Sequence, residues 1–77
     1  MTTMSDTIVA QKLRNTLSDE RFYTTGEVGL MAEHSVADVR HWIGERTLSA
    51  SKVGGRWLVR GSEVRRLLKQ LGKGDPR

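Results

Sequence analysis

Cysteine is absent from this chain, which excludes disulfide bonds, thiolate metal sites and a cysteine nucleophile together. No apolar run approaches the roughly 20 residues that a membrane span needs, and Met1 to Ser5 carry no basic segment of the kind that opens a signal peptide. With 77 residues the chain is short for a catalytic scaffold with a closed pocket. We therefore expect a cytoplasmic protein, without membrane contact, whose stability depends on packing alone.

The residue patterns of enzymes and metal sites are also missing. The sequence has no pair of carboxylates at a useful spacing, no serine and histidine with a third member, and no phosphate-binding loop. Its two histidines, His34 and His41, do not make a metal site without further ligands, and His34 is typical of a partly buried packing residue. We expect no enzyme, no metal and no cofactor.

Basic side chains are concentrated in the second half of the chain. Residues 1–39 hold three basic and six acidic side chains, whereas residues 40–77 hold ten basic and three acidic side chains. A one-sided net charge of this size is typical of a protein that binds a polyanion such as nucleic acid. The alternative is a basic surface that serves only solubility.

The N-terminal segment predicts a leader helix over residues 6–17, with Asp6 as its candidate N-cap. A helix of this length with a thin apolar stripe is marginal on its own. It therefore either packs on the domain or on a partner, or it frays. The predicted stripe lies near one face of the helix and consists of Ile8, Val9, Leu13 and Leu17.

A first short helix is predicted at Thr24 and Glu27, whose spacing matches a reciprocal capping box. Tyr23 precedes the cap and can pack on Val28 as a hydrophobic staple. Gly29 permits close approach of another helix. The predicted buried face of this helix consists of Val28, Leu30 or Met31, and Ala32.

A second short helix follows a turn at Glu33-His34 and begins at Ser35, with Asp38 favourably placed near its positive end. Two short helices joined by a tight turn are typical of a helix-turn-helix. The helical period points four side chains to the core: Val36, Val39, Trp42 and Ile43. It leaves a face of small and basic residues that can approach base edges: Ala37, Arg40, His41 and Gly44.

Gly54-Gly55 predicts a two-residue hairpin turn between strands at Leu48–Val53 and Arg56–Arg60. In this register Lys52 faces Trp57, and Trp57 covers the core together with Val59. Lys52 and Arg56 then flank the tip, where they can contact a phosphate backbone or a minor groove. The alternative is a plain solvated hairpin.

The last predicted helix spans residues 62–71 and presents one apolar face. The expected fold is therefore α+β and mainly helical: a winged helix-turn-helix with a two-stranded hairpin wing and a C-terminal helix. We divide the chain into a leader at 1–20, a winged helix-turn-helix domain at 21–71 and a flexible tail at 72–77. The apolar face of the last helix consists of Val64, Leu67, Leu68 and Leu71.

The pieces V-R-x-W-I at residues 39–43 and K-V-G-G-R-W at residues 52–57 are specific in this order and spacing. Over residues 22–69 the chain resembles the excisionase-type winged helix-turn-helix family, which is related to the DNA-binding domains of the MerR group. The resemblance implies that the second helix enters the major groove and that the wing contacts an adjacent minor groove or the backbone. It assigns DNA binding to Ser35, Ala37, Arg40 and His41 in the helix and to Lys52, Gly54, Gly55 and Arg56 in the wing.

Several positions depart from the pattern of this family, among them His34 in the turn and Val36, Ala37 and Asp38 at the start of the second helix. Glu33 and Arg46 stand where the resemblance implies turn glycines, and Leu58 faces outward where a polar residue is usual. An outward Leu58 would favour an intermolecular contact, although single exposed apolar side chains are ordinary.

An excisionase is a small architectural protein that binds repeated sites, bends DNA and directs an integrase towards excision. The resemblance therefore implies three partners in a bacterial or phage-infected cell: double-stranded DNA, a tyrosine or serine recombinase, and further copies of the chain bound cooperatively. We favour this role because little of the chain lies outside the DNA-binding module. A small phage or plasmid transcriptional regulator is the first alternative. The second is a protein-interaction module that uses the Ile8, Leu13 and Leu17 stripe together with Leu58.

Overall fold

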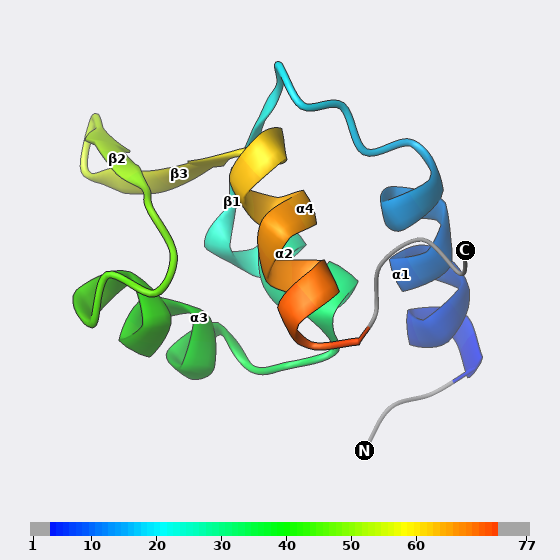
Figure 1. Cartoon of the computed structure of the whole chain (residues 1–77). Coiled ribbons are helices and arrows are strands. Elements are labelled where there is room, and N and C mark those ends of the chain that lie inside the picture. Colours follow the sequence, from blue (N-terminus) through cyan, green and yellow to red (C-terminus); the bar gives the residue numbers. More distant parts are fainter. Residues whose placement is uncertain (1–3, 73–77) are drawn as a thin grey trace.

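The computed structural model describes the backbone of residues 4–72 and the side chains of residues 8–72. The described residues form a mainly helical α+β fold, a winged helix-turn-helix, in which α2 and α4 lie centrally (Figure 1). In that view α1 lies on one side of the molecule, and α3 and the hairpin lie on the other. The elements in chain order are α1 (Met4–Asn15), β1 (Phe22–Thr24), α2 (Thr25–Ala32), α3 (Val36–Gly44), β2 (Ser51–Val53), β3 (Arg56–Arg60) and α4 (Gly61–Gln70).

The sheet has three antiparallel strands in the order β1-β3-β2. Its hairpin has the predicted register, with Lys52 opposite Trp57 and Val53 opposite Arg56. The sequence did not predict β1, which adds to the other edge of β3 and pairs Tyr23 with Val59. Leu58 alternates on β3 with the buried Val59, so it lies on the face of the sheet away from the core as predicted, and it is partly exposed there. Its use in an intermolecular contact stays a prediction.

The strand predicted from Leu48 begins only at Ser51. Leu48 is 1% exposed and belongs to the core, and the backbone N–H of Ser49 donates to the Glu63 carboxylate of α4 at 3.3 Å. These two contacts hold the segment between α3 and β2 against the helices, so it cannot extend the hairpin. The wing, which is the hairpin of β2 and β3, is therefore short. The segment between α3 and β2 forms the root of the wing, and α4 holds it in place.

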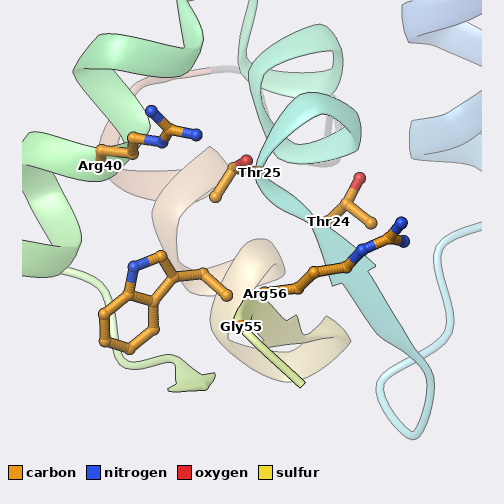
Figure 2. Close-up of a pocket in the computed structure, with 6 residues that line it drawn as sticks. Thr24, Thr25, Arg40, Gly55 and Arg56 are labelled. Carbon is orange, nitrogen blue, oxygen red and sulfur yellow. The ribbon is translucent and has the colours of Figure 1, made fainter. Parts of the chain in front are cut away.

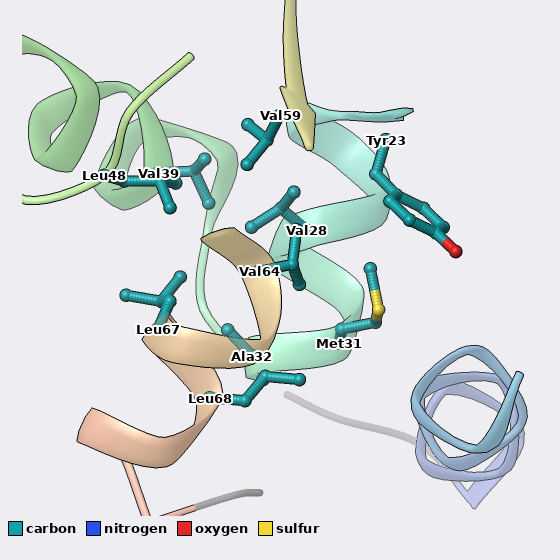
Figure 3. Packing of buried hydrophobic residues seen from close by; sticks show 10 residues of the cluster. All are labelled: Tyr23, Val28, Met31, Ala32, Val39, Leu48, Val59, Val64, Leu67 and Leu68. Atoms are coloured by element: carbon teal, nitrogen blue, oxygen red, sulfur yellow. The ribbon is translucent and has the colours of Figure 1, made fainter. Parts of the chain in front are cut away.

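The core lies between α2, α3, α4 and the sheet (Figure 3). In α2 the alternative left open by the sequence is resolved in favour of Met31, because Leu30 is exposed. The predicted apolar face of α4 is confirmed, with Leu71 partly buried at its edge. The buried cluster comprises Tyr23, Val28, Met31, Ala32, Val39, Leu48, Val59, Val64, Leu67 and Leu68.

Of the predicted core residues, Trp42 and Ile43 are partly buried and pack against this cluster, whereas Val36 and Trp57 lie outside both groups. Val36 is 39% exposed because it is the first residue of α3, and that helix turns its buried side to the core at Val39. Trp57 is half-buried because it stands on the projecting hairpin, where the Lys52 Nζ lies 5.5 Å from the centre of its ring. The ammonium group of Lys52 therefore lies near the indole ring, on the residue that the predicted register pairs with Trp57.

Helix α1 packs on α2, so the leader helix is part of the folded unit rather than frayed. It begins at Met4, which places Asp6 inside the helix and not at its N-cap. Ile8 and Val9 are 50% and 42% exposed, so the predicted stripe was wrong in its first half. The inward face consists of Ala10, Leu13 and Leu17.

The N-caps predicted for the two helices of the helix-turn-helix, Thr24 and Ser35, are confirmed. The Thr24 hydroxyl accepts the Glu27 N–H at 3.2 Å while the Glu27 carboxylate accepts the Thr24 N–H at 2.9 Å. A Cβ at Gly29 would lie 2.9 Å from the carbonyl oxygen of His34. The same Cβ would lie 3.8 Å from the backbone nitrogen of Val36, the first residue of α3. Gly29 therefore permits close approach of the turn and, as predicted, of the helix that follows it.

The two positions where the resemblance implies glycine adopt left-handed backbone conformations. Glu33 has φ 58° and Arg46 has φ 64°, a region that costs a residue with a Cβ about 1 kcal/mol. The helices therefore end with the geometry that glycine would provide, although neither residue is glycine.

Replacing Arg46 by glycine is expected to stabilise the domain by about 1 kcal/mol, because it relieves the left-handed strain. This change corresponds to a rise in Tm of about 4–8 °C for a domain of this size, measured by circular dichroism. Glu33→Gly is the matched control and should gain less, because it also removes the ion pair with Arg14 at 3.3 Å. A lower Tm for Arg46→Gly would contradict the explanation.

Candidate nucleic-acid interface

Helix α3 presents the exposed face that the sequence predicts. The Ser35 hydroxyl caps the helix by accepting the Asp38 N–H at 3.1 Å, and Val39 fixes the inward side. A Cβ at Gly44 would meet no atom within 4 Å, so this end of the face is open. The residues exposed on the outer side are Ala37, Arg40, His41 and Gly44.

Glu45 lies beside the predicted reading residue His41, with its Oε1 3.2 Å from the imidazole Nε2. The sequence analysis did not single out Glu45, although its spacing of four residues from His41 on a helix is the signal for such a pair. The carboxylate is thus the partner of one of the two ring nitrogens of His41, which leaves the other nitrogen for the predicted contact with DNA. It also adds a negative charge at the end of an otherwise neutral and basic face.

His34 packs at the turn before α3. Its ring meets the Trp42 ring edge-on, with centroids 4.9 Å apart, and its Nδ1 lies 3.1 Å from the Asp38 carboxylate. The residue thus joins the turn to α3 and packs on Trp42 as predicted, but it is exposed and not partly buried. Within residues 4–72 no three potential metal-ligating side chains come together.

The wing tip depends on the conformational freedom of glycine. Gly54 has φ 56° and Gly55 has φ 80°, the two positive values that a type I′ turn requires. Lys52 and Arg56 are exposed on either side of this turn. The tip therefore presents two cations around a backbone that no side chain covers.

The root of the wing is held by an ion pair on α4. The Glu63 carboxylate accepts from Arg66 at 2.7 Å and from the Ser49 N–H, while Arg66 also donates to the Thr47 carbonyl at 3.1 Å. The hydrogen bond from Arg66 holds the pKa of Glu63 below its ordinary value, and the Ser49 N–H acts in the same direction. The support is therefore present at neutral pH and is lost as the pH falls through that lowered pKa.

A shallow hollow of about 260 Å³ joins α3, the wing and the start of α2. Figure 2 shows Arg40 reaching in from α3 and Arg56 from the wing, with Thr24 and Thr25 at the start of α2. The hollow thus brings together three predicted residues from two separate elements: Arg40, Gly55 and Arg56. The other predicted residues lie on the same two elements but outside its lining: Ser35, Ala37, His41, Lys52 and Gly54.

The sequence analysis gave the lining residues Thr24 and Thr25 no place beside the predicted DNA-binding residues. The signal was the capping box, which places them at the positive end of α2, where the Glu27 carboxylate already accepts the Thr24 N–H. The hollow therefore combines two guanidinium groups with the positive end of a helix, an arrangement suited to a phosphate backbone.

The helix-turn-helix domain family matches residues 22–72, from β1 through the end of α4. The chain belongs to this family. A helix-turn-helix is a DNA-binding module, so the chain is a DNA-binding protein, and a non-enzymatic role is favoured. No curated protein and no solved structure matched the chain. None of the helices described between residues 4 and 72 is long and apolar enough to cross a membrane.

Proposed function

We propose that this helix-turn-helix protein is an architectural DNA-binding protein of the excisionase type. In this role it binds repeated sites, bends the DNA and directs a tyrosine or serine recombinase towards excision. The observation that supports it best is the hollow that Arg40 of α3 and Arg56 of the wing both line. The DNA-binding unit proposed here spans residues 21–71, with residues 1–20 before it and a tail at 72–77.

In this proposal α3 reads the major groove. Arg40 is the residue that can pair with the O6 and N7 of a guanine through its planar guanidinium group. Ala37 and Gly44 leave room for the helix to approach the bases, and His41 adds a second polar group on the same face. Ser35 lies at the N-terminus of the helix, where its backbone can approach a phosphate.

The wing contacts the adjacent backbone or minor groove through Lys52, Gly54, Gly55 and Arg56. A protein that contacts the duplex with a helix and a hairpin at the same time favours DNA that is bent, or whose groove is narrowed, between the two contacts. The deformation costs a few kcal/mol and is offset by the additional contacts that it permits. A bent duplex carrying several copies is the substrate that an architectural factor supplies to a recombinase.

The experiment that tests this role is selection of genomic fragments by the purified protein at about 0.15 M salt, where surface charges are screened beyond about 8 Å. The bound fragments are then footprinted and tested for bending by their gel mobility. Several closely spaced sites beside a recombinase gene, with bent DNA, are the expected result. A single promoter site without bending would instead favour a transcriptional regulator, and no enriched fragment would favour a protein-interaction module.

Arg56→Ala is expected to weaken binding to all duplexes by a similar factor and to reduce the slope of log K against log salt by about one unit, because a wing phosphate contact releases one counterion. Binding is measured by fluorescence anisotropy over a range of salt concentrations. Lys69→Ala is the matched control: it removes the same charge from the exposed surface of α4 near its C-terminal end. An unchanged slope for Arg56→Ala would remove the wing from the interface.

A further inference from the structure

Arg14 connects α1 to the end of α2. Its Nη1 donates to the Met31 carbonyl at 2.8 Å and lies 3.3 Å from the Glu33 Oε2. Met31 is in the last turn of α2 and Glu33 is its C-cap. The last carbonyls of a helix lack partners within the helix and carry its negative end, so a guanidinium group is well matched to this position.

The residue that Arg14 holds is also the left-handed residue of the helix-turn-helix. Glu33 directs the chain from α2 into α3 with φ 58°, and its N–H bonds to the Leu30 carbonyl at 3.3 Å. The following N–H, of His34, bonds to the Gly29 carbonyl at 3.0 Å. The contact at Gly29 leaves the turn little space to shift without also moving α3.

Arg14 is packed rather than freely solvated, with only 20% of its side chain exposed. Ala10 is buried in the same helix, and the neighbouring residue Leu13 packs against the core. In Figure 1, α1 lies on the opposite side of the molecule from α3 and the wing, and the Arg14 guanidinium is bound to the Met31 carbonyl and the Glu33 carboxylate. Its effect on binding must therefore act through the turn.

We propose that Arg14 is a positioning residue for DNA recognition. By holding the end of α2 and the side chain of Glu33, it fixes the turn and thereby the orientation of α3 relative to the wing. Helix α1 then contributes to DNA recognition, although it precedes both the proposed DNA-binding unit at residues 21–71 and the family match at residues 22–72. The inference rests on the proposed use of α3 and the wing as one DNA-binding surface.

A positioning role can be separated from a purely stabilising one. Partial unfolding lowers the affinity for specific and random DNA by the same factor, because both require the folded fraction. If α3 is tilted, its side chains lose contacts with particular base edges. Contacts with phosphates are lost less, because phosphates occur at every position along the DNA backbone. The ratio of specific to random affinity therefore reports position and is insensitive to stability.

The test compares Arg14→Met with Lys12→Met. Both variants remove one positive charge from α1 and keep an unbranched side chain, but Lys12 is exposed on the outer side of the helix. The probes are a duplex carrying the footprinted site and a scrambled duplex of the same composition. The specificity ratio of Arg14→Met should fall about 3- to 30-fold, whereas that of Lys12→Met should change less than about twofold. An unchanged ratio for Arg14→Met would overturn the inference.

A second measurement keeps the inference separate from the proposed function. If the wild-type chain does not distinguish the two duplexes, the proposed function fails, and hydrogen exchange at the amides of Glu33 and His34 tests Arg14 directly. Both amides should exchange faster in Arg14→Met than in Lys12→Met, while amides of α4 remain unchanged. Equal exchange in the two variants would show that Arg14 does not fix the turn.

Discussion

Replacing Gly61 by alanine is expected to destabilise the domain by about 3 kcal/mol or more, enough to leave much of a small domain unfolded. A Cβ at Gly61 would overlap the Ser18 carbonyl oxygen and lie 2.6 Å from its carbon. Both are backbone atoms, so no side chain can rotate away. The N–H of Gly61 is also bonded to the Arg21 carbonyl at 2.8 Å, which fixes the two segments against each other. Urea unfolding followed by circular dichroism measures the loss.

Gly44→Ala is the matched control for this change. A Cβ at Gly44 would meet no atom within 4 Å, and the residue ends α3. Alanine there should stabilise the helix by about 0.5–1 kcal/mol. If Gly61→Ala unfolded at the same urea concentration as the wild type, the connection between α1 and β1 would have to be free to move away from α4.

Arg40→Ala is expected to cost about 1–3 kcal/mol in binding to the selected site and much less on random DNA, because a guanidinium group that reads a base loses both hydrogen bonds at once. The side chain is exposed on α3 and lines the hollow shared with the wing, so little loss of stability should accompany the change. Affinities for the footprinted and scrambled duplexes, measured at one salt concentration, give the two values.

Arg40→Lys separates charge from geometry at the same position. Lysine keeps the positive charge but not the planar pair of donors, so it should retain binding to random DNA and lose most of the preference for the selected site. Equal losses on both duplexes, for Arg40→Ala as well, would reduce Arg40 to a phosphate contact.

The features predicted well from the sequence are those that depend on neighbouring residues. Each N-cap of the helix-turn-helix is satisfied within three residues, at Thr24 and at Ser35, and Gly54-Gly55 alone fixes the hairpin register. The exposed face of α3 follows from the helical period in the same way. These interactions are complete before any distant segment is in place, so a single sequence suffices to find them.

Several features that were missed depend on distant segments, whereas the missed pair of His41 and Glu45 is local. Strand β1 has three residues and pairs with a strand more than thirty positions away, so no local alternation marks it. Trp57 was placed in the core because the length of the wing beyond the helices is not a local property. The hollow shared by α3, the wing and the start of α2 likewise exists only when these three parts come together in the fold. The sequence identifies residues on each part but not their distance from one another.

The central position of β3 has a consequence for cooperativity. Its pairing with β2 closes a two-residue loop, whereas its pairing with β1 joins Phe22 to Arg60 and so encloses both helices of the helix-turn-helix. Closing the longer loop costs more chain entropy, and the core packed inside it must compensate. The acidic first half and the basic second half of the chain each supply strands to one sheet. Neither half can therefore complete the sheet alone, and we expect the winged domain to be gained or lost as a single unit.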